Sequence, residues 1–473
     1  MKAKKVFTIV LSALLVLTLM PAGAFALDKQ GGEIFSDMPN NWSTSALEKA
    51  VANGLLKGYA EGDKLLIKAT APIKRAEMAA VVNRAFGAVK KAGLGGVTDV
   101  AATSWYADDI AKAVMMGTFM KDNKMRPEDG ITRQEAFTVL ARAFKITSEG
   151  TGGLNSFTDK GQVAAWAENS LSAMVTAGYV QGSGGKINPK ANISRAEFAV
   201  VMDNLVKQYI VSPGEVTEVV TKGNVLVRSS DVTLRNVTIN GDLIIADGVG
   251  EGDVTLDGVT VTGRTVVRGG GENSILIKGN SSLGKVIVAK VDGKVRVAVE
   301  GGANVEIIYV DDGSDDVIVE GRFGELEVAG DDVTANAQKA NIDKVEVSGD
   351  NSRIVIANGS KVKDGNITGN SSAIVADEGS SIGKVTISGS DASVSGKGEV
   401  KEVEVKKGGD GANVTTPNTK TVVDKDVDGV TSGNQEVQGG QTATNNATGD
   451  GATVTQPSTG GSGSGSNTKV SVS

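Results

Sequence analysis

The segment ITRQE, at Ile131–Glu135, decides the fold of the first half of the chain. The same pattern stands as IKRAE at Ile73–Glu77 and as ISRAE at Ile193–Glu197. Each copy opens an apolar-periodic run, which predicts an amphipathic helix that starts at the motif. Thr132 and Glu135 have the spacing of a capping box, which satisfies the free amides at a helix start. The motif therefore predicts three similar helical units.

Two more landmarks, an Asp and a Trp, precede each motif in the same order. They recur at intervals of about 60 residues, which indicates an internal repeat. An apolar-periodic run follows each Trp and ends near a Gly, so each unit is predicted to contain two helices. The three sets of landmarks are Asp37, Trp42 and Arg75; Asp99, Trp105 and Arg133; and Asp159, Trp166 and Arg195.

The repeated Arg and Trp leave two interpretations open. In the first turn of a helix, the free amides and the helix dipole already favour an anion, and a guanidinium adds a planar donor that matches a carboxylate. A Trp beside it could stack on a sugar, so the pair suits an acidic sugar. In the alternative, the Arg pairs with a neighbouring Glu and the Trp fills the core. Repetition favours neither, because core residues repeat too.

Composition divides the chain near residue 210. It contains no Cys and no His, which excludes disulfides, Ser-His-Asp and Cys-His catalysis and the commonest zinc ligands. Only Tyr309 and Phe323, of 18 aromatic residues, lie beyond Tyr209. Residues 27–210 carry 22 basic and 19 acidic side chains, whereas residues 211–473 carry 24 and 37. This balance does not favour nucleic acid as a partner.

The first 26 residues have the form of a secretory signal peptide, with three lysines, an apolar run and a small-x-small end. Cleavage is predicted after Ala26. The alternative is an uncleaved anchor, but the run is short for a permanent span, so stable membrane insertion is not expected.

The three units resemble S-layer homology domains, at residues 32–90, 94–148 and 154–209. That family pattern is approximately F-x-D-V, W, G-x-x-x-G-Y, F-x-P and I-T-R-A-E, and the third unit follows it from Phe157 to Glu197. The resemblance implies a three-pronged pseudo-trimer around a central helical bundle. It also implies non-covalent binding of secondary cell wall polysaccharide, often pyruvylated, in grooves between the prongs. Ligand contacts are expected from Arg75, Arg133, Arg195, Trp42, Trp105, Trp166, Asp37, Asp99 and Asp159, with the arginines receiving the acidic ketal.

Some positions depart from this pattern. Lys74 replaces the capping hydroxyl, which weakens that helix start by about 1 kcal/mol. The second unit has Val97 for the usual Phe, and Lys121 where the other units have Gly58 and Gly182. A side chain at this glycine position could block the approach of a ligand to the backbone. The third unit is therefore expected to hold the best-preserved site.

From residue 211 the period of the apolar residues changes from that of a helix to two, which is typical of β-strands. VTLRNVTING begins at Val232 and VTLDGVTVTG at Val254, and similar short runs continue between Gly, Asn, Asp and Ser. About nine turns of roughly 20 residues predict a parallel β-helix or related solenoid over residues 211–406. A series of small β-sandwiches is the alternative, but the half has few aromatic residues for sandwich cores. Residues 407–473 are rich in Gly, Thr, Asn and Ser and are predicted to be a flexible linker or tail.

Acidic pairs in this half raise the possibility of a glycosidase, which needs two carboxyl groups on one face. The pairs are Asp311-Asp312, Asp315-Asp316 and Asp331-Asp332. Neighbouring Asp residues in a strand point to opposite faces, and most of these pairs lie in turns, where Asp binds local amides. Calcium binding is a further possibility for such turns, and no other cofactor is expected.

Overall the sequence predicts a multidomain protein, with an all-α anchor, an all-β solenoid and a disordered tail. We expect a secreted, non-enzymatic protein of the S-layer type, held at the cell wall by an anionic polysaccharide, with self-association in a surface lattice as a further expectation. The alternative is a wall-anchored polysaccharide-degrading enzyme with the β-helix as its catalytic domain.

Overall fold

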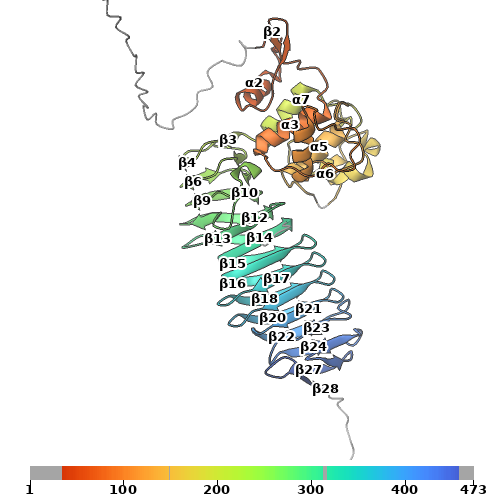
Figure 1. Ribbon diagram of the computed structural model, residues 1–473, viewed down its shortest axis with the longest axis vertical. Helices are drawn as coiled ribbons and strands as arrows, with labels where there is room; N and C mark the ends of the chain where they lie inside the picture. The colour runs from red at the N-terminus through yellow and green to blue at the C-terminus, as the bar shows by residue number, and fades with distance from the viewer. Residues whose placement is uncertain (1–34, 149, 313–316, 457–473) are drawn as a thin grey trace, which may run out of the picture.

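The computed structural model describes residues 35–148, 150–312 and 317–456. Figure 1 shows a helical region that sits on one end of a long rod of stacked strands. The predicted signal peptide lies outside the described residues. In the three described ranges, no helix is long and apolar enough to cross a membrane.

The helical region contains two α-helices in each unit, as the repeat predicts. They are α2 (Thr44–Ala52), α3 (Arg75–Phe86), α4 (Ala107–Met115), α5 (Arg133–Ala143), α6 (Ala165–Thr176) and α7 (Arg195–Leu205). The first unit also holds an antiparallel hairpin of β1 (Tyr59–Glu61) and β2 (Lys64–Leu66). Two short 3-10 helices lie at Gly152–Leu154 and Lys160–Gln162. The description of this region as all-α is therefore not confirmed.

The three units close into a ring around their motif isoleucines. The amide of Ile131 donates to the carbonyl of Ile73, that of Ile193 to Ile131, and that of Ile73 to Ile193, each at 3.0 Å. All three side chains are fully buried. Because each unit bonds to the next in the same way, the contact has cyclic three-fold symmetry. The helices α3, α5 and α7 start from this ring.

The second half is a β-solenoid of about 11 turns, in which most strands pair in parallel with the strand one turn away. It is longer than the nine turns predicted, because it begins at residue 208 and continues past residue 406. Its first strands are β3 (Gln208–Ile210), β4 (Gly214–Val216), β5 (Val225–Val227), β6 (Val232–Arg235), β7 (Thr238–Ile239), β8 (Leu243–Ile245), β9 (Val254–Asp257), β10 (Thr260–Val267), β11 (Leu276–Lys278), β12 (Ser282–Ala289) and β13 (Val295–Val299). A 3-10 turn lies at Asp247–Val249. The remaining strands of the stack are β14 (Asn304–Asp312), β15 (Val317–Val328), β16 (Thr334–Val347), β17 (Arg353–Ile356), β18 (Lys361–Ile367), β19 (Ala373–Ala376), β20 (Ser381–Ile387), β21 (Ser393–Gly396), β22 (Glu399–Val405), β23 (Asn413–Val414) and β24 (Lys420–Val423).

One column of buried β-branched residues runs the length of the solenoid. Each member pairs with the equivalent residue one turn away, so identical shapes stack at the strand spacing of about 4.8 Å. This stacking explains why Val and Ile, rather than aromatic residues, fill the core. The column consists of Ile210, Val227, Ile245, Val267, Val288, Val310, Val328, Val347, Ile367, Ile387, Val405 and Val423.

An antiparallel cap closes the far end of the solenoid, where we predicted a flexible tail from residue 407. The cap strands are β25 (Val430–Ser432), β26 (Gln435–Val437), β27 (Thr442–Asn445) and β28 (Ala452–Thr455). Buried Asn445 donates to the carbonyls of Val414 and Thr416 and accepts from Ser432, which bonds to Thr421. The disordered tail is thus not confirmed through residue 456, because these short polar side chains satisfy one another inside the cap.

The helical region and the first turns of the solenoid share one apolar core. Outward-facing Leu226, Ile244, Val266 and Ile287 pack against the helices and are at most 6% exposed. Only Val206 and Lys207 separate α7 from β3. The anchor and the rod are therefore joined by packing as well as by the chain.

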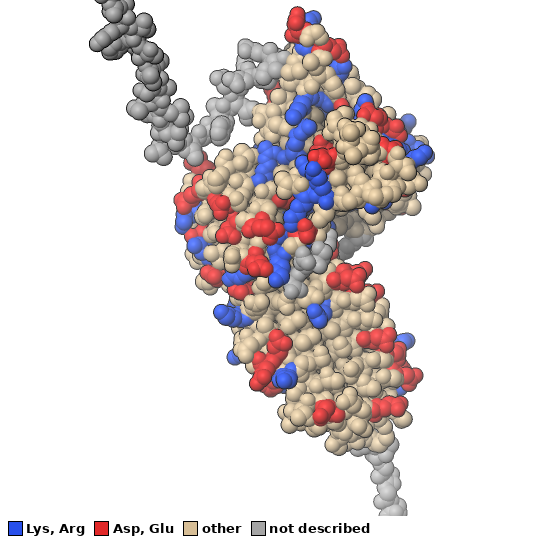
Figure 2. All heavy atoms as spheres, viewed as in Figure 1, with Lys and Arg blue, Asp and Glu red and all other residues tan. Residues whose placement is uncertain are grey.

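Four helix ends meet polar side chains of the solenoid at this junction. Arg228 donates to the carbonyl of Arg84 in α3, and Arg268 to that of Met116 after α4. Arg264 donates to Phe144 and Lys145 after α5, and Asn224 to Leu205 of α7. Cations at these positions complement the unpaired carbonyls and the negative end of the helix dipole. Figure 2 shows Lys and Arg gathered along this boundary.

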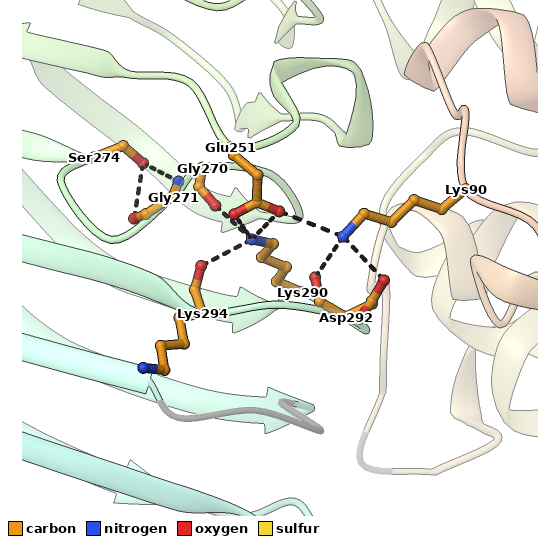
Figure 3. Close-up of polar contacts among 8 residues, drawn as sticks. All are labelled: Lys90, Glu251, Gly270, Gly271, Ser274, Lys290, Asp292 and Lys294. Carbon is orange, nitrogen blue, oxygen red and sulfur yellow. Dashed lines mark hydrogen bonds and ion pairs between the residues drawn. The ribbon is translucent and has the colours of Figure 1, made fainter.

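A lysine-centred network ties the same junction together (Figure 3). The ammonium of buried Lys290 donates to both oxygens of Glu251, and to the carbonyls of Gly270 and Lys294, at 2.7–3.0 Å. Lys90, from the segment between the first two units, reaches Glu251 at 3.3 Å and Asp292 at 2.9 Å. Burial alone would raise the pKa of Glu251, but its bonds to the two lysines hold it below the ordinary value.

We expect Arg268→Ala to destabilise the protein by about 3 kcal/mol, because it leaves the partner of a buried ion pair uncompensated. The Arg268 side chain is fully buried and binds Asp247 at 2.8 Å. Urea unfolding followed by circular dichroism measures the change. Arg322→Ala is the control, since Arg322 is an exposed solenoid residue and its loss should change stability by less than about 0.5 kcal/mol. Equal stabilities of the two variants would contradict the structural role of Arg268.

Candidate functional site

Each motif arginine lies at the start of its helix and crosses to the next unit in the ring. The Nε of Arg75 donates to the carbonyl of Met125 at 2.8 Å, and that of Arg133 to Ile187 at 2.9 Å. The Nε of Arg195 donates to Ile67 at 2.8 Å and closes the cycle. The three arginines therefore occupy equivalent positions at three boundaries, between units one and two, two and three, and three and one.

The predicted aspartates support the loops that these arginines contact. Both carboxylate oxygens of Asp159 accept backbone amides, from Ile187 at 2.9 Å and Asn188 at 2.8 Å. Asp37 and Asp99 do the same for the equivalent residues of their units. Burial alone would raise the pKa of Asp159, but these amides hold it below its ordinary value. In this structure each Asp positions a loop.

Each of the three aspartates accepts two backbone amides, and the second amide belongs to a residue with a left-handed backbone. These residues are Lys68, Arg126 and Asn188, with φ of 53°, 51° and 51°. Side chains rarely adopt this conformation without local support, which the Asp supplies. This left-handed conformation turns the carbonyl of the preceding residue toward the arginine of the neighbouring unit.

A glutamate of the next motif pairs with each arginine, but less closely at the third boundary. The Arg75–Glu135 and Arg133–Glu197 distances are 2.9 and 2.6 Å, and the two arginine side chains are 13% and 11% exposed. Arg195 is 3.8 Å from Glu77 and 3% exposed. Burial holds the pKa of Arg75 and of Arg133 below its ordinary value, although the neighbouring glutamates act in the opposite direction. The Arg–Glu pairing of the alternative interpretation is therefore present.

The tryptophans do not fill the core, as that alternative required. Trp42, Trp105 and Trp166 are 66%, 59% and 56% exposed. Large aromatic side chains are usually well buried, so exposure of all three leaves flat apolar surfaces free for a ligand.

The helix caps form as predicted at two of the three motifs. The hydroxyls of Thr132 and Ser194 accept the amides of Glu135 and Glu197. In the first unit, Glu77 still bonds to the amide of Lys74, but no cap hydroxyl is present. Lys74 instead pairs with Glu128 of the second unit.

In the second unit, Lys121 stands where the other two units have glycine, and packing explains this difference. A Cβ at Gly58 would lie 2.2 Å from the ring of Phe35, and one at Gly182 would lie 2.4 Å from that of Phe157. The second unit has Val97 in place of the Phe, so its loop has room for Lys121. The glycines thus accommodate a neighbouring ring, which differs from the ligand-approach role we inferred.

One carboxylate in each of two acidic pairs of the solenoid has a structural partner. Asp331 accepts the amide of Asp350 one turn on, and Asp332 is left-handed with φ of 58°. Asp311 pairs with Lys145 of the helical region at 2.7 Å, and Asp315-Asp316 lies outside the described residues. Within the described ranges, no group of three or more acidic side chains is placed to hold a metal ion.

Sequence reasoning missed two residues at these boundaries, Tyr59 and Arg126. The hydroxyl of Tyr59 accepts Nη1 of Arg195 at 3.1 Å, and Nη2 of Arg126 binds Glu135 at 2.8 Å. Neither belongs to the repeated Asp, Trp and Arg set. Tyr59 does stand in the family pattern, as the Tyr of G-x-x-x-G-Y, and the signal for Arg126 was that the residue before Pro127, and its equivalents, differ between units.

Known proteins resemble the helical region. The family model of the S-layer homology domain matches residues 34–79, 98–137 and 156–199. A surface-layer 125 kDa protein of Lysinibacillus sphaericus is 33% identical over 42% of this chain and 17% of its own length. An S-layer protein of Bacillus licheniformis is 26% identical over 48% of this chain and 27% of its own. An amylopullulanase of Thermoanaerobacterium thermosulfurigenes is 28% identical over 39% of this chain and 10% of its own length.

The chain thus spans a small part of each relative that it matches. The family matches fall on the three units that form the ring, and the structure adds the solenoid that follows them. The chain therefore carries three S-layer homology domains followed by a β-solenoid, and it has S-layer proteins among its homologues.

Proposed function

We propose that the three S-layer homology domains hold this protein at the cell surface by binding an anionic polysaccharide of the wall. The observation that carries the proposal is the cyclic placement of Arg75, Arg133 and Arg195 at the start of helices. The helix dipole and a guanidinium together favour a carboxylate. The exposed tryptophans add surfaces on which sugars stack. Several weak sites on one rigid ring would also anchor firmly through avidity.

The family match and the S-layer relatives support a wall or surface location. We propose further that the wall polymer is pyruvylated, because a ketal carboxylate suits the arginine sites. Self-association into a surface lattice is also proposed, by analogy with the S-layer relatives.

For the solenoid we propose a displayed, non-catalytic rod. Asp331 and Asp410 each accept a backbone amide from the next turn and Asp311 pairs with Lys145, which occupies these carboxylates structurally. A polysaccharide-degrading rod is the second candidate, and it is favoured by the amylopullulanase among the relatives.

Full-length protein should sediment with purified wall sacculi and stay in solution once the secondary polymer has been stripped from them. The physical reason is that the anionic sugars, rather than the peptidoglycan, supply the carboxylates. Quantified pelleting against both preparations checks the expectation. Replacing Trp105 and Trp166 together by Ala should weaken pelleting about tenfold, equivalent to 1.4 kcal/mol. Equal pelleting with stripped sacculi refutes the anchoring proposal.

Incubation of the full chain with acidic polysaccharides, with and without calcium, should release no reducing ends. The expectation follows because Asp331 is bonded to a backbone amide and Asp311 is paired with Lys145. A reducing-sugar assay over days, with a commercial polysaccharide lyase and hydrolase as positive controls, measures it. Any turnover that exceeds a heat-denatured sample overturns the non-catalytic proposal.

Asp159→Asn should lower stability by about 2 kcal/mol at neutral pH, since a carboxylate accepting two amides is replaced by a weaker acceptor. The pKa of Asp159 is lowered in the fold, so its contribution is present above the unfolded value of about 4 and is lost as pH falls through the folded pKa. The variant should therefore lose less stability on acidification below about pH 4. Thermal melts across pH provide the measurement. Asp63→Asn, at an exposed hairpin turn, is the control, and parallel curves for Asp159→Asn and the wild type would contradict the role assigned to Asp159.

A further inference from the structure

The three arginines are equivalent in position but differ in what remains free to bind. Each nitrogen of the Arg195 guanidinium already donates one hydrogen bond, since Nε, Nη1 and Nη2 donate to Ile67, Tyr59 and Lys57. Its guanidinium also lies 4.8 Å from the centre of the Tyr59 ring. With 3% of the side chain exposed, Arg195 has no edge left for a carboxylate.

Arg75 and Arg133 each keep one nitrogen available. Their Nε bonds to a loop carbonyl and their Nη1 to a glutamate. Across the described part of the chain, Nη2 of either residue donates no hydrogen bond. Both side chains also retain some exposure, of 13% and 11%.

Arg126 makes the boundary of units one and two different from that of units two and three. Its Nη2 binds the same Oε1 of Glu135 that Arg75 binds, at 2.8 and 2.9 Å. The other oxygen of Glu135 is held by the amide and hydroxyl of Thr132. Two guanidinium groups thus share one carboxylate, while at the second boundary Arg133 alone pairs with Glu197. The nearby carboxylate of Asp99 is committed to two backbone amides.

The position of Arg126 is filled differently at the other boundaries. Its left-handed equivalents are Asn188, which is neutral, and Lys68. Lys68 pairs with Glu61 and lies over the ring of Tyr59, where it faces the closed Arg195. Two guanidinium groups on one glutamate are therefore found at the boundary of units one and two, where the carboxylate of Asp129 also lies close enough to raise the pKa of Arg75. Since 52% of the Arg126 side chain is exposed, its remaining donors can reach a ligand.

We propose that Arg75 and Arg126 together form the principal carboxylate-binding site of the anchor, that Arg133 forms a weaker one, and that Arg195 is structural. This inference rests on the proposed function and names the site within it. Two planar guanidinium groups at one place can clamp an acidic sugar by charge-assisted hydrogen bonds, whereas a single half-occupied group cannot. Arg126 is thus a specificity-determining residue outside the repeated motif.

The test exchanges residues between equivalent left-handed positions in the full chain, so that the backbone conformation already has a precedent. Arg126→Asn should weaken binding to purified sacculi about tenfold, which corresponds to 1.4 kcal/mol. It should also flatten the salt dependence, because one cationic contact is lost. Asn188→Arg in the Arg126→Asn background should restore binding by supplying a second guanidinium beside Glu197. Lys68→Asn is the matched control and should bind within about twofold of wild type.

Sacculi whose carboxyl groups have been reduced to alcohols identify the ligand chemistry. The wild type should lose affinity for them, and the difference between wild type and Arg126→Asn should vanish. If that difference persists, the site recognises phosphate or another anion, and the carboxylate assignment is wrong. If Arg126→Asn binds like wild type, or Lys68→Asn loses as much, the site assignment is wrong although anchoring stands. Failure of the wild type to bind any sacculi removes both proposals.

Discussion

Every α-helix leaves four amides and four carbonyls without partners, and the helical region is organised around satisfying them. At the start of α3, the amides of Arg75 and Ala76 bond to the carbonyls of Asp129 and Pro127 in the next unit. The helices α5 and α7 do the same around the ring. At their other ends, the carbonyls meet arginine and asparagine side chains from the solenoid. The ring thus pairs the amides at the start of α3, α5 and α7, and the junction pairs the carbonyls at the end of the same helices.

This arrangement explains why the candidate sites lie where they do. The positive end of the helix dipole attracts a negative charge, and here each helix start is also the seam between two units. The seam brings together a loop held by one Asp, a guanidinium from one motif and a carboxylate from the next. Small changes in the loop, such as Arg126 against Asn188, then alter the charge of a seam without altering the fold.

The sequence was sufficient for the elements that repeat. Three repeated motifs, two of them with capping boxes, predicted the helix starts, and the period-two runs predicted the solenoid. The cap at residues 430–455 was mistaken for a linker, because Thr421, Ser432 and Asn445 satisfy one another only in three dimensions. The closed state of Arg195 was also out of reach, since Tyr59 lies 136 positions away along the chain.

The junction did leave a signal that could have been used. Along the outer face, the residue before each member of the buried column is apolar in the first turns, as in Leu226, Ile244, Val266 and Ile287. From Glu327 to Glu404 it is polar, as in Glu346 and Asn366. A strand that is apolar on both faces must be covered on both. The change of pattern therefore marks how far along the rod the helices extend.

The shared core of the junction has a mechanical consequence. The rod, roughly 50 Å long at 4.8 Å per turn, is attached to the ring by packed side chains and capped helix ends, with two residues between α7 and β3. A sideways load on its far end cannot be relaxed by swivelling at a linker. It is delivered as torque to the ring, where it bears on all three seams at once, so the ring and the rod resist deformation as a single lever.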